Sequence, residues 1–248
     1  MAWKWYDSQI IRITDESPNT KRFWVKVEGE EQIDFEAGQF VTMDLPIHEK
    51  RLKRWRSYSI ANAPDGTNIL EFCIVYLEGG GASEYLFKEA QIGTPIRFKG
   101  PSGTFVLPTS INKDLVFICT GTGIAPFRSM LLDVYKNNKA VKNIHLIFGT
   151  RYQNSVLYQE ELKQLQSEIE GFDYSVALSR EDHLPEGNAH IDYHKGYVHP
   201  IYQEKYATVR PDIDFYICGW SNMIDDAVAK LIVEMGYDKS QVHYELYG

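Results

Sequence analysis

Two patterns of hydrophobic and polar positions divide this chain. Up to about residue 100, short segments alternate apolar and polar residues, as strands with one buried face do. Clusters of Gly, Pro, Asn and Asp separate these segments, for example at 62–68 and 77–83. Several short strands at this spacing predict an antiparallel barrel or sandwich. The predicted strands cover 10–17, 21–30, 39–45, 56–62, 69–78 and 94–100, with one helical segment at 82–90.

From about residue 111 the pattern changes. Residues 115–120 (LVFICT) are continuously apolar, which is typical of a strand buried on both faces. Apolar residues then recur at helical spacing from Ile124 to Tyr135. The alternation of strands and helices that follows predicts a parallel sheet with crossover helices, and hence two domains, 1–110 and 111–248. The further strands are predicted at 143–150, 173–179, 214–219 and 241–248, and the further helices at 154–170 and 221–236.

Composition and charge narrow the class of protein. The chain has 248 residues and a net charge of −8, which argues against a nucleic-acid binder with its usual basic face. One local basic run, RLKRWR at 51–56, stands out against this acidic background. We find no apolar run of about 18 residues and no apolar signal segment at the start, so we expect a cytoplasmic protein without a membrane span.

The cysteines and histidines do not predict a metal site. Cys73, Cys119 and Cys218 lie far apart and form no CxxC motif, which argues against a zinc site or an iron–sulfur cluster held by this chain. Free thiols also suit a reducing compartment. Four histidines crowd one stretch that contains Pro and Gly, and we interpret that stretch as a solvated loop without a metal. They are His183, His190, His194 and His199.

A glycine-rich turn in the second half predicts a phosphate site. CTGTGIAPF (119–127) follows a buried strand and opens a helix, where unpaired N–H groups attract anions. Gly121 and Gly123 permit a tight turn and a close approach of the backbone, and Pro126 suits the first helical turn. The pattern is neither GxGxxG nor a P-loop. The alternative is an ordinary tight turn between a strand and a helix.

Cationic and hydroxyl side chains follow two other predicted strands. Arg151 stands where a standard dinucleotide-binding domain places an acid for the adenine ribose. Ser179 and Arg180 end the next strand. Each alone is an ordinary solvated strand end, but together they favour a 2′-phosphate and therefore NADPH.

The stretch RWRSYSIAN (54–62) combines a cation with an aromatic ring. Strand alternation places Arg56, Tyr58 and Ile60 on one face, with Ser57 and Ser59 on the other. An arginine beside a tyrosine suits an anion joined to a flat ring. The alternative is that Tyr58 is a core or cross-strand aromatic residue.

Six motifs, in order along nearly the whole chain, resemble those of the ferredoxin–NADP⁺ reductase superfamily. Any one of them is weak, but their shared order on a predicted β domain followed by an α/β domain is specific. The motifs are RSYS (56–59), GGAS (80–83), GPSGTF (100–105), TGTGIAP (120–126), CGWSNM (218–223) and YELYG (244–248).

The resemblance implies an N-terminal antiparallel Greek-key β-barrel that binds FAD, or FMN in its place, followed by an α/β domain that binds NAD(P). Arg56 would hold the flavin phosphate, Tyr58 would stack on the ring, and Ser59 would hydrogen-bond the N5 edge. The turn and helix start at Gly80, Gly81, Ala82 and Ser83 would bind the pyrophosphate.

In the second domain the resemblance assigns catalytic roles to Cys218, near the nicotinamide, and to Glu245, near the flavin, besides Ser59 in the first. Tyr247 would cover the flavin ring, although Gly248 follows it where plant-type members end in the aromatic residue. The residues expected to bind the nucleotide are Thr120, Gly121, Gly123, Pro126, Arg151, Ser179, Arg180, Gly219 and Met223.

The implied reaction is hydride transfer from NAD(P)H to flavin N5, followed by electron transfer to a separate acidic carrier, a ferredoxin or a flavodoxin. The basic run at Arg51, Lys53 and Arg54 would steer that carrier. KGYV (195–198) resembles the set that grips a 2′-phosphate and favours NADPH, whereas RSYSIAN resembles NADH-using oxygenase reductases most. An NADH-dependent reductase component of an oxygenase, a free-flavin reductase and a flavin-binding regulatory subunit remain alternatives.

Overall fold

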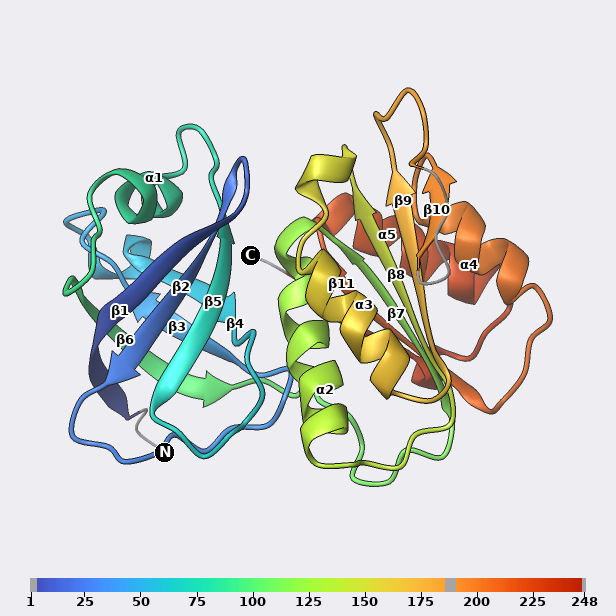
Figure 1. Cartoon of the computed structure of the whole chain (residues 1–248), viewed down its shortest axis with the longest axis horizontal. Helices are drawn as coiled ribbons and strands as arrows, with labels where there is room; N and C mark the ends of the chain where they lie inside the picture. Colours follow the sequence, from blue (N-terminus) through green and yellow to red (C-terminus); the bar gives the residue numbers. More distant parts are fainter. Residues whose placement is uncertain (1–3, 186–190, 247–248) are drawn as a thin grey trace. The chain divides into compact units, whose positions relative to one another are not determined.

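The computed structural model describes residues 4–185 and 191–246 (Figure 1). By their contacts, residues 1–106 and 125–133 form a first compact unit, and residues 107–124 and 134–248 form a second. None of the helices in the described ranges combines the length and the apolar character that crossing a membrane requires.

The first unit is a six-stranded sheet in the order β4-β3-β6-β1-β2-β5, with every neighbouring pair antiparallel. All six strands predicted in this half are confirmed, as is the helix α1 (Gly81–Lys88). The strands are β1 (Trp5–Ser17), β2 (Thr20–Val27), β3 (Phe40–Asp44), β4 (Trp55–Ser59), β5 (Ile69–Val75) and β6 (Pro95–Ser102).

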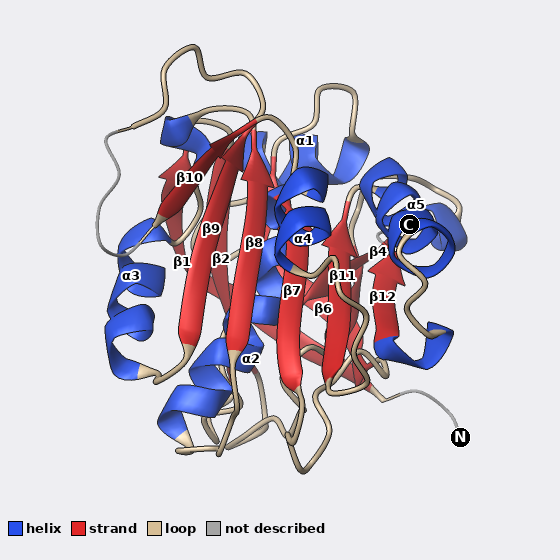
Figure 2. Cartoon of the chain, turned by 90° about the vertical axis from the view of Figure 1, so that its right-hand side faces the viewer, coloured by secondary structure: helices blue, strands red, loops and turns tan. Residues whose placement is uncertain are grey.

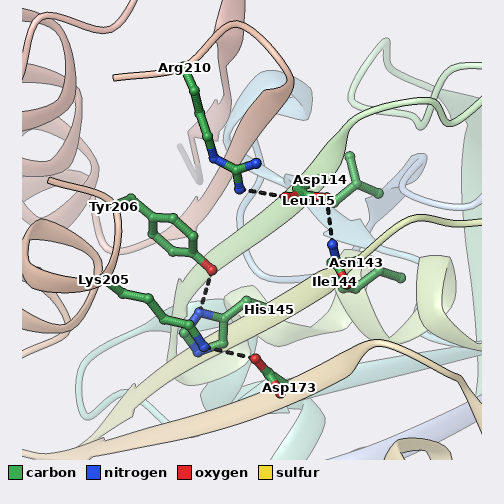
Figure 3. A pocket seen from close by; sticks show the side chains of 9 residues that line it. All are labelled: Asp114, Leu115, Asn143, Ile144, His145, Asp173, Lys205, Tyr206 and Arg210. Atoms are coloured by element: carbon green, nitrogen blue, oxygen red, sulfur yellow. Dashed lines mark hydrogen bonds and ion pairs between the residues drawn. The ribbon is translucent and has the colours of Figure 1, made fainter. Parts of the chain in front are cut away.

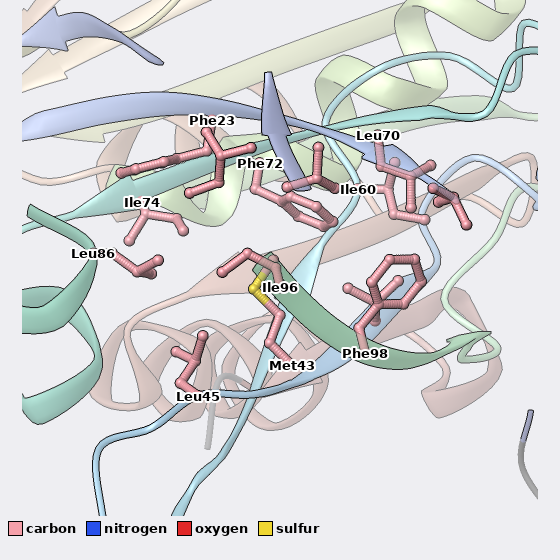
Figure 4. Packing of buried hydrophobic residues seen from close by; sticks show 14 of the residues in the cluster. Phe23, Met43, Leu45, Ile60, Leu70, Phe72, Ile74, Leu86, Ile96 and Phe98 are labelled. Atoms are coloured by element: carbon pink, nitrogen blue, oxygen red, sulfur yellow. The ribbon is translucent and has the colours of Figure 1, made fainter. Parts of the chain in front are cut away.

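The two outer strands of this sheet meet just beyond β4. The N–H of Ala61 donates to the carbonyl of Glu71 in β5 at 2.8 Å, which closes the sheet into a barrel. Because side chains alternate along each strand, one face of every strand turns inward and forms a continuous apolar core (Figure 4). The largest side chains of that core include Phe23, Phe72 and Phe98.

The second unit is a parallel sheet in the order β10-β9-β8-β7-β11-β12, visible as a row in Figure 2. Residues of α4 (His199–Lys205) and α5 (Ser221–Ala229) share one apolar cluster with the strands, so these helices cover one face. The strands are β7 (Asp114–Thr120), β8 (Ile144–Thr150), β9 (Phe172–Leu178), β10 (Asp192–Lys195), β11 (Ile213–Gly219) and β12 (Val242–Leu246). The other helix of this unit is α3 (Gln159–Glu168), and a π-helical segment, Lys230–Glu234, continues α5. Helix α2 (Ile124–Lys136) belongs mostly to the first unit, through residues 125–133.

The prediction of a solvated loop around the four histidines was wrong over part of that stretch. His194 lies in β10, which pairs in parallel with the outer side of β9, and His199 begins α4. Only tertiary pairing stabilises so short a strand, and α4 forms because it buries Ile201 and Tyr202 against the sheet. His183 lies in a loop, and His190 lies outside the described residues.

The predicted helix at 154–170 also begins later than its apolar pattern indicates. A 3₁₀ turn covers Gln153–Ser155, and α3 starts only at Gln159. The residue between them, Tyr158, has a φ of 54°, a left-handed conformation that interrupts a right-handed helix.

Candidate functional site

The carboxyl ends of the parallel strands bring most of the predicted nucleotide residues to one edge of the second unit. The chain leaves β7 toward β8 on one side of it, while β11 lies on the other side. Ligands of open α/β sheets bind at such a reversal of strand order. Thr120 ends β7 and Gly219 ends β11, so both predicted residues lie at this point.

Close backbone approach explains the glycines here. A Cβ at Gly123 would lie 2.5 Å from the carbonyl oxygen of Cys218, and one at Gly219 would lie 2.5 Å from Thr120 Oγ1. Gly219 also has a φ of 140°, which other residues rarely adopt. The N–H of Trp220 donates to Thr120 Oγ1 at 3.3 Å and ties the two strand ends together. Side chains other than hydrogen would force these segments apart.

Gly121 differs from the other two glycines because its surroundings are open. A Cβ there would meet only Trp220 Nε1, at 3.8 Å. Bare backbone at the start of α2, with Pro126 buried in the first turn of that helix, fits the approach of a phosphate. The residues at this turn therefore fit the pyrophosphate of a nicotinamide nucleotide.

Cys218 and Glu245 lie side by side, since Cys218 is the register partner of Glu245 in β12 and of Cys119 in β7. Both cysteines are fully buried, whereas Glu245 is half-buried. Burial, and the neighbouring Cys218, raise the pKa of the Cys119 thiol well above its usual value. Such surroundings favour the neutral thiol of Cys119 over a thiolate nucleophile. Met223 is nearly buried in α5.

The ends of β8 and β9 bring the three predicted phosphate ligands together. Ser179 N–H donates to the carbonyl of Thr150 at 3.0 Å, and Arg180 N–H donates to that of Arg151 at 2.9 Å. The Ser179 hydroxyl is 3.3 Å from the Thr150 carbonyl. Both arginine side chains are exposed, and neither has an ion pair within the part of the chain that the structure describes. Among the described residues, no ion pair therefore balances either guanidinium charge.

In the first unit, β4 presents Arg56 and Tyr58 on one face, opposite Met43 and Val41 of β3. Arg56 Nη1 donates to the carbonyls of Trp55 and Lys53 at 2.7 and 3.0 Å, which leaves its Nε and Nη2 without a partner among the described residues. Burial raises the pKa of Tyr58 to about 12, although Arg56 opposes the shift, so the ring stays neutral. A held guanidinium beside a neutral ring fits a flavin phosphate and its isoalloxazine.

Ser59 ends β4 and is buried, with 4 % of its surface exposed.

The start of α1 leaves N–H groups available for an anion. Gly80 precedes the helix and no side chain caps it, so the first N–H groups, from Gly81 and Ala82, have no partner within the helix. The Ser83 hydroxyl accepts from Leu77 N–H at 3.0 Å and also lies 2.9 Å from the Leu77 carbonyl. The hydroxyl therefore shapes the preceding loop, while the backbone of the helix start fits a pyrophosphate.

Sequence reasoning missed two residues at the strand-order reversal. Trp220 is 61 % exposed beside Gly121, and Cys119 lies next to Cys218. A large exposed aromatic residue directly after Cys-Gly was the available signal for Trp220, whereas the position of Cys119 depends on strand register. The predicted Tyr247 lies outside the described residues.

Arg51, the first residue of the basic run at 51–56, belongs to a cationic cluster in the first unit. Trp5 and Trp55 lie with ring centroids 5.7 Å apart. Arg51 lies over both rings, Arg97 over Trp5 and Lys99 over Trp55, with distances to the centroids of 4.3 to 5.6 Å.

Arg54, which we also expected to steer the carrier, forms an ion pair with Asp44 at 2.8 Å, so its charge is locally balanced.

Comparisons with known proteins identify the two domains and the family. Residues 7–107 match the oxidoreductase FAD-binding domain family, and residues 117–229 match the oxidoreductase NAD-binding domain family. The chain is 30 % identical over 243 residues to ferredoxin–NADP reductase B of Sorangium cellulosum, which covers 98 % of this chain and 97 % of that one. It is 27 % identical to phenol hydroxylase P5 protein of Acinetobacter pittii, of which it spans 65 %.

Among solved structures, a ferredoxin NADP⁺ reductase from Neisseria gonorrhoeae with bound FAD and NADP is similar with a TM-score of 0.79 and 26 % identity, covering 98 % of each chain. The Amycolatopsis cytochrome P450 reductase GcoB has a TM-score of 0.85 at 24 % identity, over 99 % of this chain and 70 % of that one, and shows the fold alone. Domain order, fold and sequence therefore agree, and this chain belongs to the ferredoxin–NADP⁺ reductase superfamily of FAD- and NAD(P)-dependent oxidoreductases.

Proposed function

We propose that this enzyme takes a hydride from NADPH onto bound FAD and then passes the electrons to a separate acidic carrier of the ferredoxin or flavodoxin class. The observation that supports the choice of NADPH is the pairing of Arg151 with Arg180 beside Ser179 at the carboxyl edge. Two exposed arginines that form no ion pair with a described residue suit a dianionic 2′-phosphate better than two ribose hydroxyls.

On the flavin side, Arg56 binds the phosphate through the guanidinium nitrogens that its backbone contacts leave available. Tyr58 covers the ring, and Ser59 hydrogen-bonds its N5 edge. The N–H groups of Gly81 and Ala82 bind the pyrophosphate. When bound, the flavin supplies the hydride acceptor and divides two electrons into single transfers.

On the nucleotide side, the turn at Gly121 and Gly123 receives the pyrophosphate, and Cys218 orients the nicotinamide. Glu245, its neighbour in the sheet, stabilises charge or relays a proton at the reaction centre. These roles follow the family motifs.

The cationic cluster around Trp5 and Trp55 is our candidate docking surface for the carrier. Its positive charge stands out in a chain with a net charge of −8 and would attract an acidic protein over long range. Three buried free cysteines suit a reducing compartment, and we place the enzyme in the cytoplasm.

A second candidate is a reductase component of an oxygenase. It is favoured by a 30 % identity to the anthranilate 1,2-dioxygenase electron transfer component of Acinetobacter baylyi, which covers 78 % of this chain and 53 % of that one. In that case NADH, and not NADPH, would be the electron donor.

The first experiment is an anaerobic titration of the flavin-loaded protein with NADPH and, separately, with NADH, following the loss of flavin absorbance. We expect NADPH to reduce the flavin faster, and Arg180→Gln to raise KM for NADPH about tenfold without changing the reaction with NADH. Arg12→Gln, which replaces an exposed arginine of β1, is the matched control and should change neither the KM for NADPH nor the reaction with NADH. A preference for NADH in the unaltered protein would favour the oxygenase reductase instead.

The docking surface has its own test. The double variant Arg51→Glu/Lys53→Glu should slow the reduction of an acidic ferredoxin about tenfold at low salt but leave the reduction of a small neutral dye unchanged. Lys26→Glu, on the exposed side of β2, is the control. Equal loss with carrier and dye would contradict steering.

A further inference from the structure

A buried ion pair lies where the barrel of the first unit closes. Glu71 of β5 and Arg128 of α2 are 2 % and 5 % exposed. Arg128 Nη1 donates to Glu71 Oε2 at 3.0 Å, while Arg22 Nε of β2 donates to Oε1 of the same carboxylate at 2.7 Å. A buried carboxylate thus has an arginine on each oxygen, which compensates its loss of hydration.

The same helix residues hold the chain that leaves β4. Arg128 Nη1 also donates to the carbonyl of Ala61 at 2.6 Å, and the Ser129 hydroxyl donates to the carbonyl of Asn62 at 2.6 Å. From the opposite direction, Glu71 accepts from Ala61 N–H, and Glu71 N–H donates to Asn62 Oδ1, both at 2.8 Å. Residues 61 and 62 are therefore fixed by β5 on one side and by α2 on the other.

This fixed point is two residues beyond Ser59, the end of the strand that carries Arg56 and Tyr58. The intervening Ile60 is fully buried, and its N–H donates to the carbonyl of Gln39 at 2.9 Å. No flexible link separates Ser59 from Ala61, so the position of the Ala61 carbonyl determines where β4 ends.

Stability alone does not explain a charged group at this place. Apolar residues of similar volume often stabilise a buried site as well as an ion pair does, or better. A guanidinium that bridges a carbonyl and a carboxylate instead imposes one geometry on both. We propose that Arg128 and Ser129 are positioning residues of the flavin site, which hold the Ala61 and Asn62 carbonyls and so fix Ser59 and Tyr58 against the flavin.

This inference rests on the proposed function, because it needs a flavin at β4. Its test compares Ser129→Ala, Arg128→Met and Arg128→Lys in the full-length, flavin-loaded protein. Arg210→Met is the matched control, since Arg210 also forms an ion pair with a buried carboxylate, that of Asp114, in the second unit. For each variant we would measure thermal unfolding, the flavin dissociation constant, the shape of the flavin absorbance band, the flavin midpoint potential, and kcat and KM for NADPH.

We expect Ser129→Ala, which removes one neutral hydrogen bond, to weaken flavin binding about threefold. Arg128→Met removes a set of charged hydrogen bonds and should weaken flavin binding about thirtyfold. Both should alter the absorbance band and the midpoint potential and lower kcat while KM for NADPH stays unchanged. Arg128→Lys, which keeps the charge but reaches fewer partners, should restore part of each effect. Arg210→Met should lower the unfolding temperature only.

The inference is overturned if the Arg128 and Ser129 variants lose thermal stability, as the control does, but keep the flavin dissociation constant, absorbance band, potential and kcat of the unaltered protein. Should Arg128→Met fail to fold, Ser129→Ala decides by the same measurements, because it removes one hydroxyl and leaves the ion pair. An unaltered protein that binds no flavin would instead overturn the proposed function, and this inference with it.

Discussion

At the carboxyl edge of the parallel sheet, β7 and β11 end in bare backbone around Gly121 and Gly219, and the neighbouring Arg151 and Arg180 have no ion pairs within the described residues. At the amino edge of the same sheet, the strands begin with polar side chains that bond one another. Both edges belong to one sheet, but the carboxyl edge presents backbone and cationic side chains, whereas the amino edge presents side chains that bond one another.

The amino edge holds a cavity of about 180 Å³ (Figure 3). Asp114, at the start of β7, pairs with Arg210 and accepts from Asn143 Nδ2 at 2.8 Å. His145 is buried between the hydroxyls of Tyr206 and Ser175, each 2.8 Å from one of its ring nitrogens. The cavity is lined by Asp114, Leu115, Asn143, Ile144, His145, Asp173, Lys205, Tyr206 and Arg210.

The difference between the two edges shows that a hollow surface does not by itself identify a ligand site. At the amino edge the principal polar groups already have partners, so a ligand would have to break those bonds before making its own. At the carboxyl edge, N–H groups and cations are available to a ligand without such a cost. We therefore assign the amino edge to stability and the carboxyl edge to function, and the following changes test that division.

The largest effect is expected from Gly219→Ala at the carboxyl edge. Its Cβ would collide with Thr120 Oγ1 and displace the end of β11, so NADPH-driven flavin reduction should fall about a hundredfold, as small misplacements near reacting groups do. Gly236→Ala is the control: its φ of 84° is also left-handed, but a Cβ there would meet nothing within 4 Å. Stopped-flow reduction of both variants measures this, and equal rates would contradict the assignment of function to the carboxyl edge.

At the amino edge, Asp114→Ala should lower the free energy of unfolding by about 3 kcal/mol, because it removes a buried carboxylate that pairs with Arg210 and accepts from Asn143. Reduction of the flavin by NADPH should keep its rate at temperatures where the variant is folded. Urea unfolding and stopped-flow reduction measure the two quantities. If activity fell while stability held, the amino edge would have to be counted as part of the site.

The pH dependence of stability should depend on His145 at this edge. Burial, together with the nearby charge of Lys205 and opposed by Asp173, lowers the pKa of His145 from 6.5 to about 3 in the folded protein. The unfolded chain therefore takes up a proton first as the pH falls below 6.5, and stability is lost progressively until the pH nears 3. The loss should reach about 2 kcal/mol at pH 5 relative to neutral pH.

Urea unfolding from pH 7 to pH 5 measures how steeply the free energy of unfolding falls with pH. The difference in this slope between the unaltered protein and His145→Gln is the contribution of His145. Burial also lowers the pKa values of His199 and His243, and both remain in the variant. A variant with an unchanged slope would show that His145 is not the group responsible.

The smallest effect is expected from Lys205→Met, at the rim of the same cavity. Its ion pair with Asp173 is 2.8 Å long but exposed on both sides, so the unfolding free energy should fall by about 0.5 kcal/mol or less, and high salt should abolish the difference. Chemical unfolding at low and high salt measures this. A loss as large as that of Asp114→Ala would mean that exposure does not distinguish the two pairs.

The sequence alone predicted much of the fold. Alternation located the six strands of the barrel, because burial of one face requires an apolar residue at every second position. Apolar runs that alternate with helices located five of the six strands of the parallel sheet, because most of these strands are buried on both faces. It missed β10 and α4, where the strand has four residues and the pattern is too short to carry a period. It also placed the start of α3 too early, since nothing in Tyr158 itself indicates a left-handed φ.

The sequence also determined the family and the motifs of the candidate site, because glycines at fixed spacing and paired arginine and tyrosine residues are local features. Only the tertiary structure decided which distant residues meet: Cys119 beside Cys218, the bond of Trp220 to Thr120, and the bonds of Arg128 to Glu71 and of Ser129 to Asn62. The physical reason is that strand register and helix packing join residues up to a hundred positions apart, and no local pattern encodes such a pair.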